Sequence, residues 1–225
     1  TYAIMVTDQA TSDSRTDPVE PATATDPDET KRLQQAAERE QLLEAADIDL
    51  AKQIGLQQVK LQVAKLKANT RMNNARVAKG LPPAVRSNHL IFTGPPGTGK
   101  LTIARIVAQT YCGLGVLATS KVVEAKRSSF VAGHLGQTAL KTDALIDSAL
   151  DGILFIDEAY TLIQEGLSGG DAFGREAVDT LLARMENERT RLMVIIAGYD
   201  LEIHRFNDAK EWKASRIQKQ IAFTS

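Results

Sequence analysis

The sequence predicts an α/β fold in which a parallel β-sheet lies between layers of helices, with a helical extension in front of it. From Asn88 onward, short apolar runs alternate with longer amphipathic segments, a pattern typical of a parallel sheet flanked by helices. One apolar run, 89–92, lies directly before a glycine-rich turn, and another, 153–156, directly before an acidic pair. The 225 residues are enough for one main domain with an appendage.

Residues 1–30 lack the large apolar side chains that a folded segment buries. Thr, Asp, Pro, Ala and Ser make up most of 7–30, and the first thirty positions hold seven acidic residues against Arg15 alone. So little burial cannot offset the entropy lost on ordering, which predicts a flexible acidic linker over 1–30. Because position 1 is not Met, we also expect the sequence to be a piece of a longer protein.

Residues 31–87 are predicted to form two helices that lead into the main domain, 88–225. Leu33, Leu43 and Leu50 belong to an apolar stripe with helical spacing that ends near 54–56. A second helix is expected over about 57–79, where the Gly and Pro residues of 80–83 end it.

Within the main domain, runs rich in β-branched and aromatic residues predict the strands, and the amphipathic segments between them predict the helices. The predicted strands are 89–93, 122–127, 152–157 and 191–197. The predicted helices are 100–112, 138–150 and 174–187, with loops at 113–115, 132–133 and 166–170.

The turn from Gly94 to Lys100 reads GPPGTGK, which between a strand and a helix is typical of a nucleotide triphosphate site. Its glycines let backbone N–H groups surround a phosphate chain, the following helix adds its positive end, and the lysine reaches the outer phosphates. The residues predicted to contact nucleotide here are Gly94, Pro95, Pro96, Gly97, Thr98, Gly99, Lys100, Leu101 and Thr102.

The acidic pair Asp157 and Glu158 supplies the other half of such a site. At the end of a buried strand, Asp157 is suited to hold Mg²⁺ through its water shell, and Glu158 to orient and polarise the water that attacks the terminal phosphate. A nucleoside triphosphate and Mg²⁺ are therefore the predicted ligands; that the nucleotide is ATP is implied by the family resemblance described below. A solvated strand end is a weak alternative because the four preceding residues are all apolar.

Leu101 departs from this pattern, since Ser or Thr normally follows the lysine and ligates Mg²⁺. Backbone groups and Lys100 can still bind phosphates, so we expect hydrolysis to suffer more than binding. Thr102 is a poor substitute because the next helical position faces about 100° away.

Composition excludes several classes of protein. The 28 acidic and 27 basic residues give no electrostatic case for nucleic acid as a partner, and no apolar run reaches the roughly 18 residues of a membrane span. The single cysteine, Cys112, excludes an internal disulfide and fits a reducing compartment, so a cytoplasmic location is expected. His89, His204 and Cys112 have no metal-ligand spacing.

GPPGTGK at 94–100, ILFIDEAY from Ile153, DTLLARMEN from Asp179 and VIIAGY from Val194 together resemble AAA+ ATPases of the CbxX/CfqX family. The similarity covers about 46–225. YCGLG from Tyr111 and IDSALDG from Ile146 are closest to the EccA group, from type VII (ESX) secretion systems, with red-type Rubisco activases a less close match. The resemblance implies a P-loop AAA+ fold, ATP hydrolysis and a homo-oligomeric ring, a hexamer, that acts on secreted proteins or their chaperones.

The resemblance also assigns roles to particular residues. It places Ile54, Gly55 and Leu56 on the adenine ring, with a simple helix break as the alternative. His134-Leu135-Gly136 matches the loop that grips a translocated polypeptide, although a surface turn explains it equally well. Arg216 matches the arginine finger that reaches a neighbouring subunit's site; a solvated surface arginine is the alternative. Gly198-Tyr199 stands where the family usually has a polar phosphate sensor.

Two functions stay open at this stage. The first is the motor core of a ring that remodels or delivers secretion substrates, which Lys100, Asp157, Glu158 and Arg216 favour. The second is a nucleotide-binding subunit with poor hydrolysis, which Leu101, Trp212 and Ala214 favour because each departs from the family pattern. The small helical lid of the family, expected after the core, is missing from the sequence, which also favours the second.

Overall fold

The computed structural model of the protein describes residues 27–84, 87–134, 136–163, 171–203, 217 and 219–223. The linker predicted for 1–30 falls outside this part of the chain up to residue 26, and the loop predicted at 166–170 falls outside it entirely. The described elements are, in order, α1 (Pro27–Lys52), α2 (Gln57–Ala78), β1 (Leu90–Thr93), α3 (Lys100–Gly113), β2 (Val122–Ala125), α4 (Arg127–Phe130), α5 (Gln137–Ala149), β3 (Ile153–Ile156), the 3₁₀ helix η1 (Ala159–Leu162), α6 (Ala172–Asn187), β4 (Met193–Gly198) and β5 (Lys219–Ala222).

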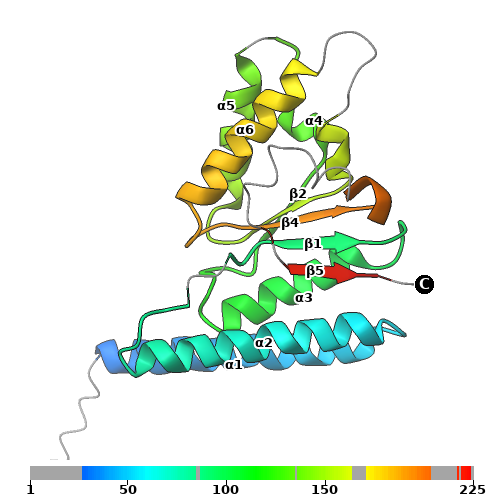
Figure 1. Ribbon diagram of the computed structural model, residues 1–225. Coiled ribbons are helices and arrows are strands. Elements are labelled where there is room, and N and C mark those ends of the chain that lie inside the picture. The colour runs from blue at the N-terminus through cyan, green and yellow to red at the C-terminus, as the bar shows by residue number, and fades with distance from the viewer. Residues whose placement is uncertain are drawn as a thin grey trace, which may run out of the picture.

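A parallel sheet of five described strands forms the middle layer, in the order β2-β3-β4-β1-β5 (Figure 1). Since all strands run in one direction, their carboxyl ends lie along one edge of the sheet. The predicted α/β class is confirmed, and the four predicted strands are present. β5 was not predicted, because only Ile221 and Phe223 of its neighbourhood are apolar enough to suggest a strand.

Helices cover both faces of the sheet. In Figure 1, α4, α5 and α6 lie on one side, and α3 with α1 and α2 on the other. Leu90 and Phe92 of β1 pack in the core beneath α3, whereas Ile91 packs with residues of α5 and α6. The two cores follow the alternation of side chains along each strand, which is the arrangement expected of a sheet buried on both faces.

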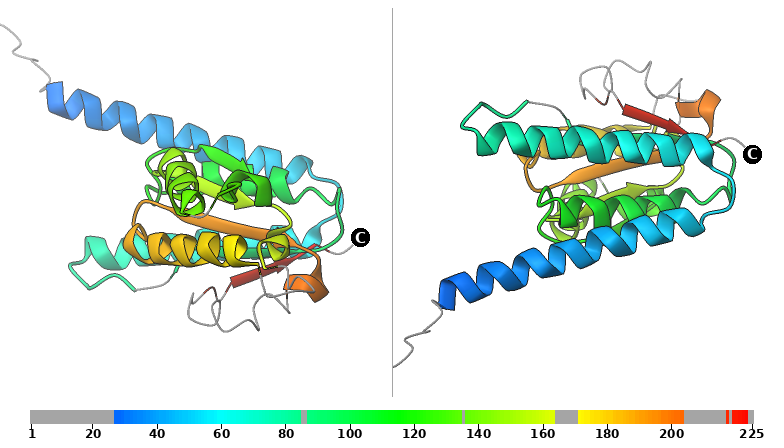
Figure 2. Two further views of the ribbon diagram at one scale, coloured as in Figure 1. Left: turned by 90° about the horizontal axis from the view of Figure 1, so that it is seen from above. Right: turned by 90° about the horizontal axis from the view of Figure 1, so that it is seen from below.

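The first helix starts four residues earlier than predicted, at Pro27. Proline fits the first turn of a helix, and the acidic side chains of Asp28 and Glu29 interact favourably with the helix dipole. The amino-terminal part of α1 extends past the body of the domain (Figure 2), and its residues up to 41 are exposed. Further along, α1 presses on α3: a Cβ added to Gly113 would lie 2.6 Å from Cγ of Leu43.

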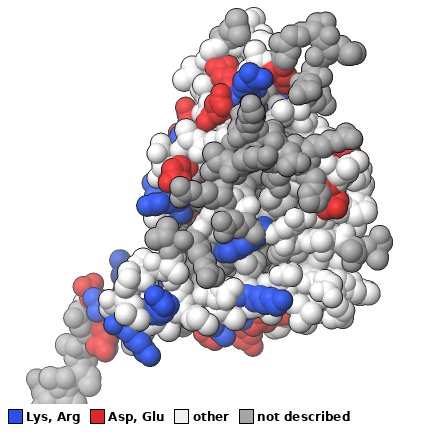
Figure 3. All heavy atoms as spheres, in the orientation of Figure 1, with Lys and Arg blue, Asp and Glu red and all other residues white. Residues whose placement is uncertain are grey.

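The described surface carries both charges. On the face in Figure 3, acidic and basic side chains are interspersed among uncharged ones, as the nearly balanced composition predicts. None of the helices in the described ranges combines the length and hydropathy of a membrane span. After β2, the chain forms the short helix α4 at Arg127, where the sequence had predicted strand to 127.

Candidate functional site

The turn between β1 and α3 has the backbone conformation that its glycines permit. Gly97 and Gly99 have φ angles of 78° and 84°, in the left-handed region that other residues adopt at a cost. Gly99 stands at the N-cap of α3 with no side chain capping the helix. No side chain at Gly99 therefore competes for the first backbone N–H groups of α3. A phosphate-binding turn requires these N–H groups to be accessible.

Gly94 is required for a different reason, the approach of β5. Its φ is 144°, and a Cβ at this position would collide with the carbonyl oxygen of Phe223. The N–H of Phe223 donates to the carbonyl of Thr93 at 2.7 Å, which continues the pairing of β5 with β1 past the last strand residue. The start of the glycine-rich turn is thus held between two elements about 130 positions apart in sequence.

Lys100 is folded into the turn. Its Nζ donates to the carbonyl oxygens of Gly94 and Pro95 at 2.9 and 2.7 Å, and only 8% of the residue is exposed. Burial lowers the pKa of Lys100, while the charge of Asp157 acts in the opposite direction. Thr98 braces the same turn through a hydrogen bond from Oγ1 to the carbonyl of Pro95. The ammonium of Lys100 is thus held by two carbonyl oxygens of the turn.

Asp157 and Glu158 follow β3 directly. The N–H of Asp157 donates to the carbonyl of Ala125 on β2, and its Oδ1 accepts the N–H of Glu158 at 3.1 Å. Glu158 has φ 51° and ψ 43°, an uncommon conformation for a residue with a side chain. Its carbonyl accepts hydrogen bonds from the backbone N–H and the Oγ1 of Thr161, which hold the turn into η1.

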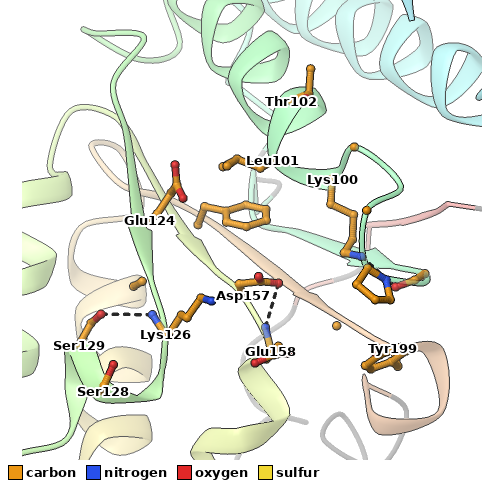
Figure 4. Close-up of a pocket in the computed structure, with 17 residues that line it drawn as sticks. Lys100, Leu101, Thr102, Glu124, Lys126, Ser128, Ser129, Asp157, Glu158 and Tyr199 are labelled. Carbon is orange, nitrogen blue, oxygen red and sulfur yellow. Dashed lines mark hydrogen bonds between the residues drawn. The ribbon is translucent and has the colours of Figure 1, made fainter. Parts of the chain in front are cut away.

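These segments enclose a pocket of about 570 Å³ at the carboxyl edge of the sheet (Figure 4). Its lining includes most of the predicted site residues of the turn and of β3. They are Gly94, Pro96, Gly97, Gly99, Lys100, Leu101, Thr102, Asp157 and Glu158. Pro95 and Thr98 belong to the same turn without lining the pocket.

The segment predicted to contact adenine lies near the turn but not in the pocket lining. Gly55 and Leu56 have positive φ angles, and Leu56 stands at the N-cap of α2. A Cβ built on Gly99 would be 4.0 Å from Cδ1 of Leu56. Ile54 is 98% exposed. The connection between α1 and α2 therefore passes beside the glycine-rich turn, and the apolar side chain of Ile54 in this connection lies almost fully in solvent.

The donor set fits Mg²⁺ only through water. Asp157 offers a carboxylate in the pocket, whereas Leu101 packs against the core beneath α3 and presents no oxygen. Thr102 is exposed, and Figure 4 shows it farther from Asp157 than Leu101 is. The residue after Lys100 thus supplies no direct ligand, and Asp157 is the predicted residue that would hold the ion by its hydration shell.

Sequence reasoning missed the contribution of β2. Glu124, Lys126, Ser128 and Ser129 line the pocket opposite α3. Lys126 is exposed, and its backbone N–H donates to Oγ of Ser129 at 3.2 Å. The available signal was the position of these residues directly after a strand parallel to β3, whose carboxyl end must reach the same edge.

The end of β4 closes the pocket with Gly198 and Tyr199. A Cβ on Gly198 would lie 3.0 Å from Cδ1 of Ile203 and 3.2 Å from Cδ1 of Tyr160, so close packing against β4 favours glycine here. The rings of Tyr199 and Tyr160 are 6.3 Å apart, and burial followed by the charge of Glu158 raises the pKa of Tyr160. A phenol therefore stands where the resemblance implied a phosphate sensor.

Arg127 connects three elements behind the acidic pair. Its Nη1 donates to the carbonyl of Thr161 at 2.8 Å and pairs with Oδ2 of Asp171 at 2.5 Å, while Oδ1 of Asp171 accepts the N–H of Gly174 and caps α6. Burial alone would raise the pKa of Asp171, but Arg127 and the backbone N–H groups of the helix start hold that pKa below its ordinary value. The cluster fixes η1, and thereby the turn at Glu158.

Other predicted site residues are not brought to the pocket by the described chain. Arg216, with Trp212 and Ala214, lies outside the described residues, as does Leu135. His134 and Gly136 are exposed before α5. No group of three potential metal ligands occurs within the described ranges, and His89 and Cys112 are buried.

Comparison with known proteins gives one family match and several similar relatives. The model of the ATPase family associated with various cellular activities (AAA) matches residues 90–225. The ESX-3 secretion system protein EccA3 of Mycolicibacterium smegmatis is 47% identical over 226 residues, covering 100% of this chain and 36% of that protein. The ESX-1 secretion system protein EccA1 of Mycobacterium tuberculosis is 55% identical over 185 residues, covering 82% of this chain and 32% of that protein. The chain spans about a third of the length of these relatives.

Proposed function

We propose that this chain, which belongs to the AAA family of ATPases, binds ATP in the pocket of Figure 4 and hydrolyses it to ADP and phosphate. The observation that carries the proposal is the convergence of Lys100, Asp157 and Glu158 on one pocket from two separate strand ends. Such a convergence supports a site in which the turn binds phosphate and the carboxylate of Glu158 activates water.

The residues divide the work as follows. The N–H groups of the turn at 94–99 and of the first turn of α3 donate to the phosphates, and Lys100 exchanges its hydrogen bonds to Gly94 and Pro95 for bonds to phosphate oxygens. Glu158 accepts a hydrogen bond from the attacking water and polarises it. Mg²⁺, held by Asp157 through water, would neutralise part of the phosphate charge when bound.

The experiment compares nucleotide binding and phosphate release by the protein and two variants. Glu158→Gln keeps the size of the side chain and one acceptor oxygen but removes its basicity, so we expect binding to persist and turnover to fall at least about 100-fold. Lys100→Ala should lose binding itself. Turnover by Glu158→Gln equal to that of the unaltered protein would contradict the proposal.

A second function, a nucleotide-binding subunit with poor hydrolysis, is favoured by one observation, the apolar Leu101 in the pocket lining. Leu101→Thr restores the hydroxyl that the site lacks, and we expect it to raise turnover while affinity changes little. Turnover that is already high in the unaltered protein, and unchanged in Leu101→Thr, would exclude this second function. Slow turnover that Leu101→Thr leaves unchanged in an assembled ring would sink the idea that Leu101 limits hydrolysis.

The larger assembly is proposed from the relatives. EccA3 and EccA1 are secretion system proteins by name, and their similarity supports a cytoplasmic motor of the CbxX/CfqX type that remodels or delivers type VII secretion substrates. In this proposal the chains form a hexameric ring, Arg216 acts on the neighbouring subunit's site, 54–56 contact adenine, and 134–136 grip the substrate. Size measurement with and without ATP tests the ring, and Arg216→Ala should abolish turnover without preventing assembly.

A further inference from the structure

The pocket contains a cation that neither the sequence motifs nor the family match assigns. Lys126 follows β2 and extends toward Asp157 across the pocket from Lys100 (Figure 4). Within the described part of the chain, no carboxylate comes within 4.0 Å of its ammonium. Its near neighbour Glu124 is paired instead with Arg105, at 2.8 Å. Among the described residues, the ammonium of Lys126 is therefore available to a ligand.

The backbone at Lys126 is held in place on both sides. Its N–H donates to Oγ of Ser129 and its carbonyl accepts the N–H of Ser129, which closes the turn into α4. The next residue, Arg127, is anchored to the carbonyl of Thr161 and to Asp171. The stem of Lys126 thus starts from a fixed point at the pocket wall, so directing its ammonium to a ligand costs only side-chain entropy.

The opposite wall offers no side-chain oxygen at the position after Lys100. Leu101 fills its position with an apolar side chain packed on the core, so a divalent ion at this site has no protein oxygen there. A polyphosphate still needs its negative charge compensated when it enters the pocket. The two lysines, one on each side of Asp157, are the cationic side chains of the described lining.

We propose that Lys126 binds the phosphates of the nucleotide together with Lys100 and supplies part of the charge compensation that Mg²⁺ gives in related sites. Nucleotide binding to this pocket is then only weakly dependent on Mg²⁺. The proposal rests on the proposed ATP site and deepens it, because it names the residue and the form of the ligand: a nucleoside triphosphate that binds with or without its metal ion.

The test measures the affinity of a fluorescent ATP analogue in excess Mg²⁺ and in excess EDTA. For the unaltered protein we expect the two dissociation constants to agree within about fivefold. Lys126→Met keeps the length and apolar stem of the side chain but removes the charge, and should weaken binding in EDTA about tenfold or more, since charge-assisted hydrogen bonds are lost. In Mg²⁺ its effect should be smaller.

Two further variants serve as controls. Lys121→Met makes the same change of charge at an exposed lysine just before β2, at the far end of that strand from the pocket, and should leave both affinities unchanged. Lys126→Arg keeps the charge and should keep binding in EDTA. Urea unfolding of each variant verifies that the fold is retained.

Several outcomes overturn the proposal. Lys126→Met with the affinities of Lys121→Met in EDTA would show that Lys126 is only a solvated side chain. A loss of more than about thirtyfold in affinity when EDTA replaces Mg²⁺ in the unaltered protein would show that the metal remains essential. A protein that binds no nucleotide under either condition would overturn the proposed ATP site as well. Nucleotide binding whose affinity is unchanged in Lys126→Met overturns this inference alone.

Discussion

At the amino ends of its strands, the sheet pairs polar groups with one another, whereas at the carboxyl ends it keeps charged groups available. Before β1, Nδ1 of the buried His89 accepts the N–H of Val194 at 3.0 Å. Before β3 and β4, the guanidinium of Arg191 donates two hydrogen bonds to the carboxylate of Asp151, at 2.8 and 2.7 Å. The amino edge thus satisfies its own polar groups.

The carboxyl edge is arranged differently. Lys100 donates to backbone carbonyls, Lys126 has no acid within 4.0 Å among the described residues, and Glu158 sits in a left-handed backbone conformation. Such features cost stability and persist where a ligand can use them. The two edges of the sheet therefore differ in role. The polar groups of the amino edge contribute to stability, whereas the charged groups of the carboxyl edge are positioned for a ligand.

The largest expected effect tests whether the carboxyl edge is dispensable for stability. Gly94→Ala places a Cβ against the backbone of Phe223, which cannot move without disturbing β5, so we expect a loss of about 3 kcal/mol in the free energy of unfolding. Gly97→Ala, in the same turn, has a similar backbone requirement with nothing within 4 Å of the added Cβ, and should cost about 1 kcal/mol.

Urea unfolding of the two variants measures this difference. Equal losses would mean that the left-handed backbone, and not the contact with β5, determines the cost at Gly94. Because Gly97 lines the pocket and Gly94 also supports β5, the expected contrast would separate a glycine needed for folding from one needed mainly for the phosphate-binding turn.

The second prediction concerns the amino edge. Burial lowers the pKa of His89 to about 4, while a hydrogen bond to the carbonyl of Met185 and the charge of Glu186 act to raise it, and Lys219 acts to lower it. The folded protein therefore binds this proton less well than the unfolded chain does, whose histidine has a pKa of 6.5. Stability from His89 is complete above pH 6.5 and is lost as the pH falls toward 4.

At pH 5 this amounts to about 2 kcal/mol of lost unfolding free energy relative to neutral pH. His89→Asn retains an acceptor for the N–H of Val194 but does not titrate, so its stability should fall less between pH 7.5 and pH 5. Urea unfolding at the two pH values checks this by comparing the pH-dependent change, since the variant also loses its bond to Met185. The same pH dependence of stability in both proteins would show that titration of His89 does not cause the loss of stability at pH 5.

The carboxyl edge also separates what the sequence predicts from what it does not. The turn at 94–100 is one continuous segment whose glycines, lysine and flanking apolar runs each carry a local reason for their identity, so its place between β1 and α3 follows from sequence. The buried strand before Asp157 is also predictable from local sequence, because the four residues that directly precede Asp157 are all apolar.

Residues that depend on distant neighbours were not predictable in this way. Nothing in the local sequence distinguishes Lys126 from other basic residues. Its place in the pocket depends on the parallel pairing of β2 with β3. β5 carries no strong strand pattern of its own and is recognised through its contact with Gly94. Arg127 and Asp171 form an ion pair although they are 44 positions apart in sequence, and no local sequence pattern predicts that they meet.

The smallest expected effect is local to the turn that carries Glu158. Arg127→Met removes the donor to the carbonyl of Thr161, and should open η1 more often, so that amide exchange at Thr161 and Ile163 becomes about tenfold faster. Arg184→Met is the matched control, because Arg184 joins α5 to α6 by ion pairs with Asp143 and Asp147 and has no bond to η1. Hydrogen exchange measured by mass spectrometry tests this without relying on turnover. If both variants accelerate exchange in η1 equally, the helix layer as a whole holds the turn. Acceleration in Arg127→Met alone means that one half-buried arginine keeps the backbone of Glu158 in its left-handed conformation.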